Sequence, residues 1–232
     1  MADSLSDNAA LARASQDLYA AVRRDAPLVQ CLTNFVSMNF AANVLLAMGA
    51  SPAMVHATDE APEFARIAGA VVINIGTLSA PWLESMLLTA DAARQAGIPW
   101  VLDPVAHHAT AFRRDAVQRL LALRPAIIRG NASEIIALAG GQSAGKGVDA
   151  RDAVAQAEQS AQAIAAAHQT VVAVTGETDY VTDGLRAVRI TGGSALMPRV
   201  TATGCALTAL VGAFAAVSKS DPYTAAVAAL SC

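Results

Sequence analysis

The sequence predicts an α/β fold, in which a largely parallel sheet is flanked by helices and carries an antiparallel hairpin at one edge. Short apolar runs rich in Val and Ile alternate with longer amphipathic, Ala-rich runs. This is the pattern of parallel strands that helices cover on both faces, joined by right-handed crossovers. After Thr175 the alternation stops, and two strand-like runs flank Asp183-Gly184, a strong hairpin signal.

The elements follow in order along the chain. We expect the parallel strands at residues 28–32, 53–56, 70–75, 100–102, 126–128 and 171–174. Helices are expected between them, near residues 36–48, 60–68, 80–96, 110–123, 133–139 and 151–168. The hairpin strands are residues 179–182 and 187–190, and a long apolar helix follows at about 206–217. No linker, internal repeat or low-complexity tract is visible, so we expect residues 1–232 to form one domain.

The composition excludes two classes of protein. Hydrophobic residues make up 54% of the 232 residues, charged residues only 15%, and the net charge is −3. A chain with this much apolar surface to bury is not disordered. A nucleic-acid binder would need a clustered basic surface, which this charge balance argues against. The excess of apolar surface also favours a homo-oligomer with a buried subunit interface.

The long uncharged stretches do not predict a membrane span. Residues 31–58 carry no charge, yet several asparagines, Gly49 and Pro52 interrupt them. The N-terminus lacks the basic start and apolar core of a signal peptide. Cysteines stand at only three positions, an odd number without metal-ligand spacing, namely Cys31, Cys205 and Cys232. They suit a reducing compartment better than a disulfide framework, so we expect a cytoplasmic protein.

Polar residues stand at the carboxyl ends of five predicted strands. They are Thr33 and Asn34; Asn74, Gly76 and Thr77; Asp103; Arg129 and Asn131; and Thr175, Gly176 and Glu177. In open α/β sheets ligands bind at this edge. Turn and cap roles are the alternative for each residue taken singly, but their convergence on one edge predicts a binding site.

Two segments are candidates for binding phosphate. Residues 140–146 match the GxxxxGK pattern, but they follow a predicted helix, and Gly147 stands where a phosphate loop has Ser or Thr. We interpret them as a surface loop. Residues 201–205 directly precede the apolar helix, where small residues and free amides attract anions. An ordinary small-residue helix entry is the alternative. Cys205, in the first helical turn, is expected to have a lowered pKa.

Residues 129–134 run from a strand end into a helix. A phosphate would satisfy the donors of Arg129 at the end of an otherwise apolar strand. Asn131 or Ser133 can cap the helix, and the helix dipole alone partly explains Glu134. Asp103 ends another strand, and its carboxylate could join Glu134 around Mg²⁺ through water. The 4 histidines lack zinc-ligand spacing, so we expect surface or capping roles for them.

Eight short motifs occur in the order of one known family. They are PLVQCLTN at 27–34, GASPAM at 49–54, INIGTL at 73–78, LDPVA at 102–106, RGNASE at 129–134, VTGE at 174–177, DYVTDG at 179–184 and TGCAL at 203–207. Together they closely resemble hydroxyethylthiazole kinase, of the ribokinase-like superfamily. The resemblance runs from about residue 15 to the C-terminus.

The resemblance implies a ribokinase-like fold and an activity. The family phosphorylates the primary alcohol of 4-methyl-5-(2-hydroxyethyl)thiazole in thiamine salvage, with ATP as co-substrate and Mg²⁺ as cofactor. It also implies a homotrimer with active sites between subunits. Related kinases have an aspartate base at the position of Cys205, and this family is unusual in having cysteine there.

The resemblance also assigns candidate site residues. Catalytic roles fall on Cys205 and on the anion hole at 202–205, which includes Gly204 and Thr203. Arg129 and Thr175 match positions that bind the nucleotide phosphates, and Asp103 and Glu134 match acidic residues associated with magnesium. The positions expected to bind the thiazole are Met54, Ala202 and Asn34.

The chain departs from the family pattern in two places. Ala202 replaces a common glycine, which adds a methyl group near the substrate. Relatives continue through further C-terminal helices after the position of Cys232, so we expect a domain shortened at its C-terminus. Three alternatives stay open. They are a pyrimidine- or pyridoxal-type kinase of the same superfamily, a nucleotide-repair dehydratase of similar fold, and a non-catalytic ligand-binding oligomer. Cys205 and the GASPAM segment argue against the first.

Overall fold

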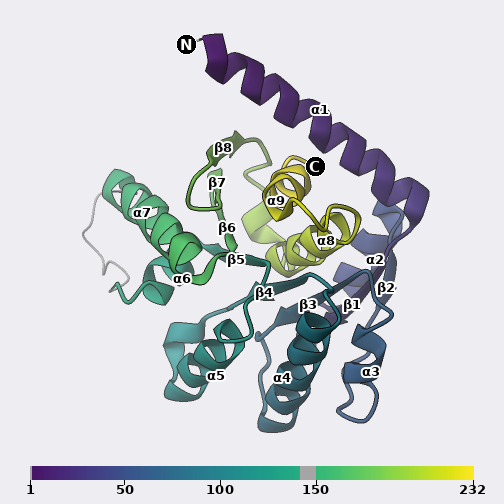
Figure 1. Ribbon diagram of the computed structural model, residues 1–232. Helices are drawn as coiled ribbons and strands as arrows, with labels where there is room; N and C mark the ends of the chain where they lie inside the picture. The colour runs from purple at the N-terminus through teal and green to yellow at the C-terminus, as the bar shows by residue number, and fades with distance from the viewer. Residues whose placement is uncertain (1, 142–149) are drawn as a thin grey trace.

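A computed structural model describes residues 2–141 and 150–232 of the protein. In these residues the strands form one mixed sheet of order β2-β1-β3-β4-β5-β6-β7-β8. The strands β1 to β6 are parallel, and β7 and β8 continue the sheet as an antiparallel hairpin. Helices cover both faces of the sheet (Figure 1). The predicted fold class is therefore confirmed.

The strands are short, as expected for parallel strands buried on both faces. They are β1 Leu28–Leu32, β2 Ser51–Ala53, β3 Ala70–Asn74, β4 Trp100–Asp103, β5 Ile127–Asn131, β6 Val171–Thr175, β7 Thr178–Thr182 and β8 Ala187–Thr191. The prediction of a strand at 53–56 was wrong, because β2 begins at Ser51 and ends at Ala53. Pro52 is accommodated because β2 is an edge strand, where a missing N–H need not break the ladder.

Seven of the helices lie where the sequence predicts them. They are α2 Met38–Met48, α3 Ala61–Ala65, α4 Ala80–Gln95, α5 Ala111–Leu121, α6 Ala132–Leu138, α7 Ala150–His168 and α8 Thr203–Val217. Single 3₁₀ turns add η1 His107–Ala109 and η2 Met197–Arg199.

Two helices, α1 Ala2–Asp25 and α9 Pro222–Leu230, were not predicted. The start of α9 carried a usable signal, since Asp221 accepts a hydrogen bond from the Thr224 amide (3.4 Å) and Pro222 occupies the first turn.

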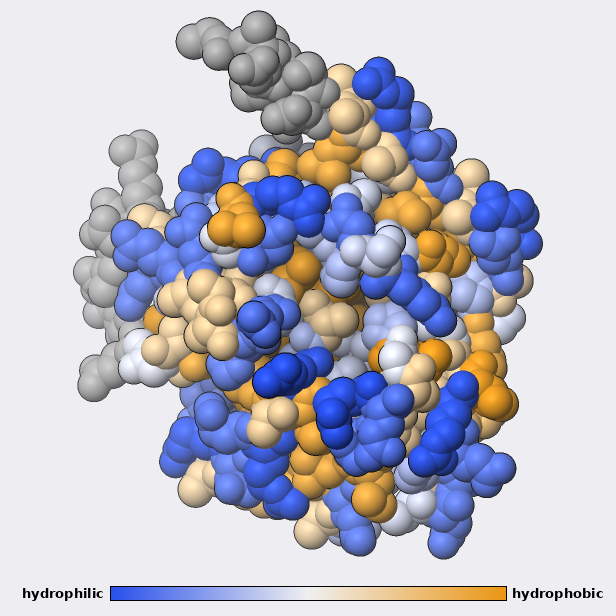
Figure 2. Space-filling model, viewed as in Figure 1, coloured by the Kyte–Doolittle hydropathy of each residue, from blue (hydrophilic) through white to orange (hydrophobic). Residues whose placement is uncertain are grey.

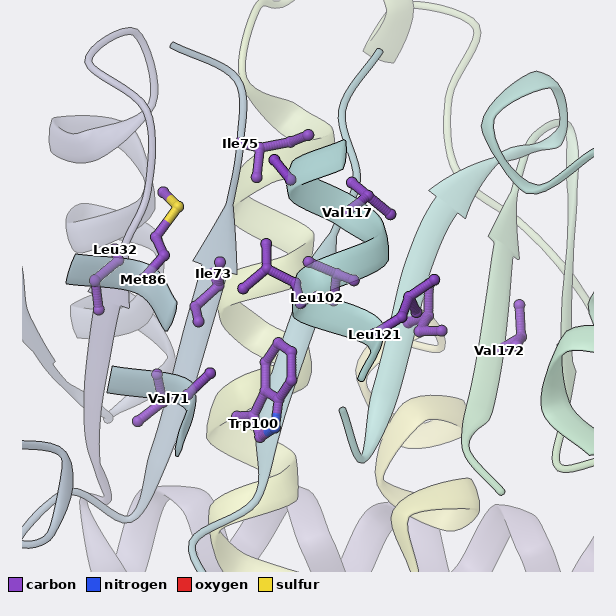
Figure 3. Close-up of a cluster of buried hydrophobic side chains, with 14 of the residues drawn as sticks. Leu32, Val71, Ile73, Ile75, Met86, Trp100, Leu102, Val117, Leu121 and Val172 are labelled. Carbon is purple, nitrogen blue, oxygen red and sulfur yellow. The ribbon is translucent and has the colours of Figure 1, made fainter. Parts of the chain in front are cut away.

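The strand side chains alternate between two hydrophobic clusters. Val71 and Leu102 point to the face covered by α3 to α7, as the close-up of this cluster shows (Figure 3). Val72 and Val101, their chain neighbours, point to the face covered by α1, α2, α8 and α9. This alternation follows from the two-residue period of a strand. It leaves the carboxyl edge of the parallel strands as the place where polar side chains gather.

Helix α8 packs unusually close to the sheet. A Cβ atom added at Gly212 would lie 2.5 Å from Cγ2 of Val72, so no larger residue fits without a shift of the helix. Ala206, Ala209 and Ala213 of the same helix are also buried. Small residues therefore set the depth at which α8, and the residues at its start, sit above the strand ends.

Two further sequence predictions concern membrane spans and the GxxxxGK match. Within residues 2–141 and 150–232, no helix has both the length and the apolarity that a bilayer span requires. Most of the GxxxxGK match at 140–146 lies outside the described residues. The segment that precedes it is helical, as α6, which agrees with the argument against a phosphate loop.

Candidate active site

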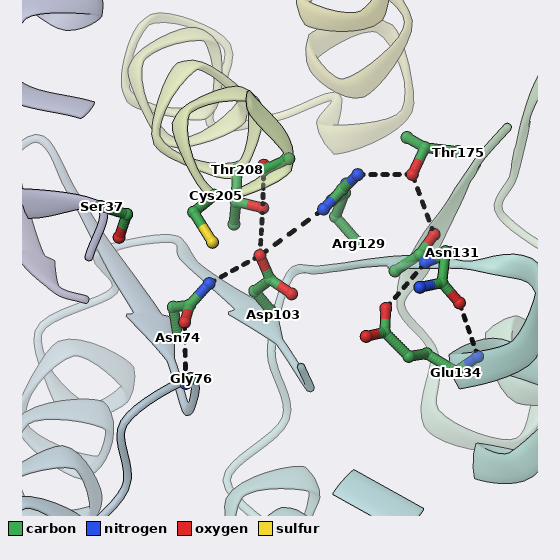
Figure 4. Close-up of polar contacts among 12 residues, drawn as sticks. Ser37, Asn74, Gly76, Asp103, Arg129, Asn131, Glu134, Thr175, Cys205 and Thr208 are labelled. Atoms are coloured by element: carbon green, nitrogen blue, oxygen red, sulfur yellow. Dashed lines mark hydrogen bonds and ion pairs between the residues drawn. The ribbon is translucent and has the colours of Figure 1, made fainter. Parts of the chain in front are cut away.

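Asparagines from two strand ends connect the start of α8 to the centre of the sheet edge. Asn34, after β1, donates through Nδ2 to Asn74 Oδ1 (2.9 Å) and to Cys205 Sγ (3.2 Å). Asn74, the last residue of β3, donates through Nδ2 to Asp103 Oδ2 (2.8 Å). Figure 4 shows the Cys205 thiol pointing from α8 toward Asn74 and Asp103. The expected convergence of Asn34, Asp103 and Cys205 is therefore present.

Asp103 is the most deeply buried charged group of the site. Its side chain is fully buried, and Oδ2 accepts a hydrogen bond from Thr208 Oγ1 (2.7 Å). Burial raises the pKa of Asp103 to about 6, against the opposing effects of Arg129, Thr208 and Asn74. The other carboxylate oxygen, Oδ1, has no hydrogen-bond partner among the described residues. A buried oxygen that lacks a partner in the protein is a candidate for pairing with a bound ion or water.

Arg129 lies between Asp103 and the end of β6. Its Nη1 is 3.7 Å from Asp103 Oδ2, and its Nη2 donates to Thr175 Oγ1 (Figure 4). The guanidinium comes from β5, whose preceding residues are fully buried, so the strand itself holds the cation at the sheet edge. The structure thus brings together Arg129 and Thr175, the two residues expected to bind nucleotide phosphates.

Glu134 has a structural partner for each of its oxygens. Oε1 accepts the amide of Ala106 (3.0 Å), and Oε2 accepts the amide of Asn131 (2.9 Å). The Asn131 side chain in turn accepts the Glu134 amide (2.9 Å), which completes a capping box at the start of α6. The capping explanation of these residues is therefore correct. The capping box and the Ala106 amide together hold the Glu134 carboxylate in a fixed orientation.

The carboxylates of Asp103 and Glu134 fit a Mg²⁺ site, one by direct contact and the other through water. Among the described residues, no group of three or more His, Cys, Asp or Glu side chains forms a ready metal cage. Mg²⁺ commonly uses one or two carboxylates and keeps several waters, so a cage is not required. The unpartnered Oδ1 of Asp103 suits direct ligation. Glu134, whose oxygens already accept amides, suits contact through water.

The first three amides of α8 have no hydrogen-bond acceptor among the residues that the structure describes. The first amide that closes a helical turn is that of Ala206, which donates to Ala202 O (2.9 Å). The amides of Thr203, Gly204 and Cys205 precede it and can face an anion. The Thr203 hydroxyl turns away to donate to Val200 O (3.3 Å).

Gly204 brings this turn against Arg129. A Cβ atom on residue 204 would lie 2.8 Å from Arg129 Nη1, so the absence of a side chain lets the guanidinium and the free amides share one space. Two kinds of anion-binding donor therefore meet at the start of α8.

The prediction of a lowered pKa for Cys205 was wrong. Burial, and then the nearby Asp103 carboxylate, raise the pKa of the thiol above its ordinary value. The hydrogen bond from Asn34 and the Arg129 charge act in the opposite direction and are outweighed. The helix-start argument failed because it ignored desolvation and an acidic neighbour. Cys205 is therefore a protonated thiol at neutral pH.

Ala202 adopts a left-handed backbone conformation, with φ +67° and ψ 3°. This conformation strains a residue with a Cβ and is free of strain in glycine. The finding gives a backbone reason for the glycine expected at this position, in addition to the proposed steric effect on substrate.

We expect Ala202→Gly to leave the fold unchanged and to stabilise it by about 0.5–1 kcal/mol, because relief of strain exceeds the added entropy of the unfolded chain. Thermal and urea unfolding would measure this difference. Ala96→Gly is the control, since Ala96 is right-handed (φ −85°) and should lose stability instead. A loss of stability in both variants would contradict the strain argument.

Two sequence predictions are not joined to this network. Met54 follows β2 and packs against the hydrophobic cluster under α8, but no described polar contact links it to Asn34 or Cys205. His107 was expected at the surface or in a cap, yet it is buried with Nδ1 3.2 Å from Pro104 O. Burial lowers the pKa of His107, so this ring is a neutral part of the turn after β4.

Sequence reasoning missed two residues that shape the site. Asn74 was noted at a strand end but not assigned, although it links Asn34 to Asp103. Thr208 was missed entirely. Its position three residues after Cys205 places both on the same face of a helix, which is the signal that could have found it.

The fold and the site together define a class. A parallel sheet whose carboxyl edge carries a buried carboxylate, an arginine and free helix-start amides is suited to phosphoryl transfer. Pyridoxal kinase from Bacillus subtilis has the same fold, with a TM-score of 0.63 at 15% identity over 88% of each chain. A ribokinase-like superfamily protein from Enterococcus faecalis matches with a TM-score of 0.60 at 12% identity, over 88% of this chain and 75% of its own. The chain thus has a ribokinase-like fold, and the donors at its sheet edge are of the kind that phosphotransferases use.

The family follows from three comparisons. The model of the hydroxyethylthiazole kinase family matches residues 19–232. Hydroxyethylthiazole kinase from Rhizobium leguminosarum bv. trifolii is 68% identical over 213 residues, which are 92% of this chain and 80% of the relative. The structure of the protein of that name from Pyrococcus horikoshii has a TM-score of 0.84 at 43% identity, covering 92% of this chain and 80% of its own. The chain belongs to the hydroxyethylthiazole kinase family.

Proposed function

We propose that the protein transfers the γ-phosphoryl group of ATP to the primary hydroxyl of 4-methyl-5-(2-hydroxyethyl)thiazole, in thiamine salvage. The observation that carries the proposal is the hydrogen-bonded network at the sheet edge. It joins Cys205, through Asn34 and Asn74, to Asp103, and Asp103 lies beside Arg129. An acceptor alcohol at Cys205 and a phosphate at Arg129 would meet above one buried carboxylate.

The chain's own residues supply the charge stabilisation. Arg129 and the free amides of residues 203–205 would hold the transferred phosphoryl, with Thr175 orienting the guanidinium. Asp103 and Glu134 would hold Mg²⁺, the first directly and the second through water. When bound, the ion neutralises negative charge on the phosphates.

Cys205 would orient the acceptor hydroxyl. A protonated thiol cannot take up a second proton, so we assign Cys205 to positioning the substrate oxygen rather than to strong base catalysis. Phosphoryl transfer needs little base strength, because its transition state is loose and the hydroxyl proton leaves late. The half-buried thiol is fixed for this task by the hydrogen bond from Asn34.

Asn34 would form a rigid wall of the thiazole pocket. Its Oδ1 accepts the amides of Val36 (3.1 Å) and Ser37 (3.1 Å), while both protons of Nδ2 are donated to Asn74 and Cys205. The side chain has little capacity left for a direct hydrogen bond to substrate. Met54 and Ala202 would contribute apolar contact to the ring.

The activity is tested by following the phosphorylated thiazole by mass spectrometry, with ATP and Mg²⁺, in the presence and absence of the thiazole alcohol. Parallel reactions omit ATP or Mg²⁺. Product that requires the thiazole alcohol, ATP and Mg²⁺ together would support the proposal. Pyridoxal and hydroxymethylpyrimidine serve as competing acceptors in parallel reactions. Phosphorylation of one of these in preference to the thiazole would contradict the proposed substrate.

We further propose a cytoplasmic homotrimer with active sites between subunits. Large apolar side chains are exposed on and just before α2, namely Phe35, Val36, Phe40 and Leu46. Figure 2 shows hydrophobic patches among hydrophilic ones on the face in view. Light scattering measures the mass of the oligomer in solution. Leu46→Glu places a charge on the exposed apolar surface at α2 and should lower that mass. Leu185→Glu, at an exposed hairpin turn, is the control.

The stability of the metal-free protein should depend on pH through Asp103. Its folded pKa of about 6 lies above the ordinary 3.8, so the folded state holds this proton more tightly than the unfolded state. Ionisation of Asp103 therefore lowers the free energy of unfolding as pH rises from about 4 to about 6, and adds no further change above that window. Thermal unfolding in a chelator measures this slope.

The variant Asp103→Asn has no carboxyl to titrate, so the decrease between these pH values should become smaller than in the parent protein. The Asp91→Asn variant is the control, because Asp91 is a surface residue paired with Arg94. An unchanged slope in Asp103→Asn would show that Asp103 does not titrate in this range.

A further inference from the structure

Arg113 ties together the two loops that border the site. It lies in the first turn of α5, and its Nη1 donates to Ile75 O (2.8 Å) and to Val105 O (2.9 Å). Its Nη2 donates to Gly76 O (2.6 Å). Among the described residues, no carboxylate forms an ion pair with it. Its planar group of donors is therefore committed to backbone carbonyls that follow β3 and β4.

The loop after β3, at Ile75 and Gly76, packs directly against the side chain of Asn34. A Cβ atom at Gly76 would lie 2.7 Å from Asn34 Nδ2 and 2.8 Å from its Cγ, so the backbone of Gly76 is in direct contact with that side chain. The Gly76 amide also donates to Asn74 Oδ1 (2.9 Å). A shift of this loop would move both asparagines, and with them the contacts to Cys205 and Asp103.

The second loop carries the amide that orients Glu134. Val105, whose carbonyl Arg113 binds, is followed by Ala106, whose amide donates to Glu134 Oε1 (3.0 Å). Ala106 has a left-handed backbone (φ +48°), which only a well-restrained loop maintains in a residue other than glycine. One guanidinium thus restrains the acceptor side and the metal side of the site.

We propose that Arg113 is a positioning residue for the acceptor alcohol. By holding the loops after β3 and β4 at a fixed spacing, it keeps Asn34 and Cys205 aligned with the hydroxyl that is phosphorylated. The inference rests on the proposed function for the identity of the substrate. It predicts a larger defect in alcohol binding than in ATP binding, because the loop that Arg113 holds through Gly76 packs directly on Asn34, whereas Glu134 on the metal side keeps a second partner in the Asn131 amide. Arg129 and Thr175 form their hydrogen bond to each other without Arg113.

Steady-state kinetics would compare Arg113→Ala with Arg114→Ala. Arg114 is the matched control, an adjacent and exposed arginine of α5 whose side chain, among the described residues, donates only to His108 O (2.8 Å). We expect Arg113→Ala to raise KM for the thiazole alcohol about tenfold, with KM for ATP changed less than about twofold. Arg114→Ala should change neither. Methylguanidinium should restore much of the lost activity of Arg113→Ala, and methylammonium should not, because only the planar group offers several aligned donors.

Hydrogen exchange of the free protein provides a readout that needs no substrate. Peptides covering residues 75–77 and 104–106 should exchange faster in Arg113→Ala than in Arg114→Ala. Arg113→Lys keeps the charge but not the donor fork, so it should fold and still show part of both defects.

Equal exchange in the two alanine variants, or equal rises of both KM values, would overturn the proposal. A parent protein that phosphorylates no thiazole would refute the proposed function, and the exchange comparison would still decide whether Arg113 holds the loops.

Discussion

Replacement of Cys205 by alanine is expected to lower kcat about 100-fold, the scale of losing the alignment of a reacting group. The thiol is half-buried, is fixed by the Asn34 hydrogen bond, and points toward Asp103 (Figure 4). KM for ATP should stay within about twofold, because Arg129 and Thr175 remain in place. Steady-state kinetics with each substrate varied in turn measures both effects.

Two further variants make this test specific. Cys205→Asp should retain more activity than Cys205→Ala, because a carboxylate can also contact the hydroxyl and would act as a base. Cys232→Ala removes an exposed thiol at the end of the chain and should behave as the parent protein. Equal turnover of the parent and Cys205→Ala would remove Cys205 from the mechanism.

Replacement of Arg129 by alanine is expected to raise KM for ATP by about tenfold or more, because a charged phosphate contact would be lost. The same variant should be less stable by about 2 kcal/mol, because the fully buried Asp103 carboxylate would lose its counter-charge. The pKa of Asp103 should rise further, since Arg129 is the strongest effect that lowers it. Kinetics and denaturant unfolding measure the two consequences separately.

The control for the stability effect is Arg189→Ala. Arg189 forms an ion pair with Glu158 (2.6 Å), but its side chain is 63% exposed, so its loss should cost less than about 0.5 kcal/mol. Arg129→Lys should recover stability better than ATP affinity, because it keeps a charge near Asp103 but not the bidentate donors. An unchanged KM for ATP in Arg129→Ala would refute its assigned phosphate role.

Most of the fold could be predicted because its strands are buried on both faces. Runs such as 70–75 and 171–174 are continuously apolar, and their carboxyl ends must meet at one edge of a parallel sheet. That argument was enough to bring Asn34, Asp103, Arg129 and Thr175 into one predicted site. The exact strand at Ser51–Ala53 escaped it, because an edge strand tolerates a proline that the general pattern penalises.

The parts that could not be predicted depend on contacts between distant segments. Nothing local to Arg113 shows that its donors reach Ile75, Gly76 and Val105. The sign of the Cys205 pKa shift likewise depends on burial and on Asp103, which is remote in sequence. Local rules on helix starts gave the opposite sign. Sequence patterns located the site here, whereas tertiary structure determined its electrostatics.

Because α8 packs directly on the sheet, residues far from the substrate help to determine where the Cys205 thiol lies. Cys205, Thr208 and Gly212 follow one another at intervals that place them on one face of the helix, and Gly212 is about 10 Å along the axis from Cys205. A methyl group at residue 212 would push the helix off Val72 and draw the thiol back from the sheet. Engineering for bulkier alcohols could therefore begin two turns away from the substrate, with graded changes of volume beneath the helix, and leave every residue that meets the ligand intact.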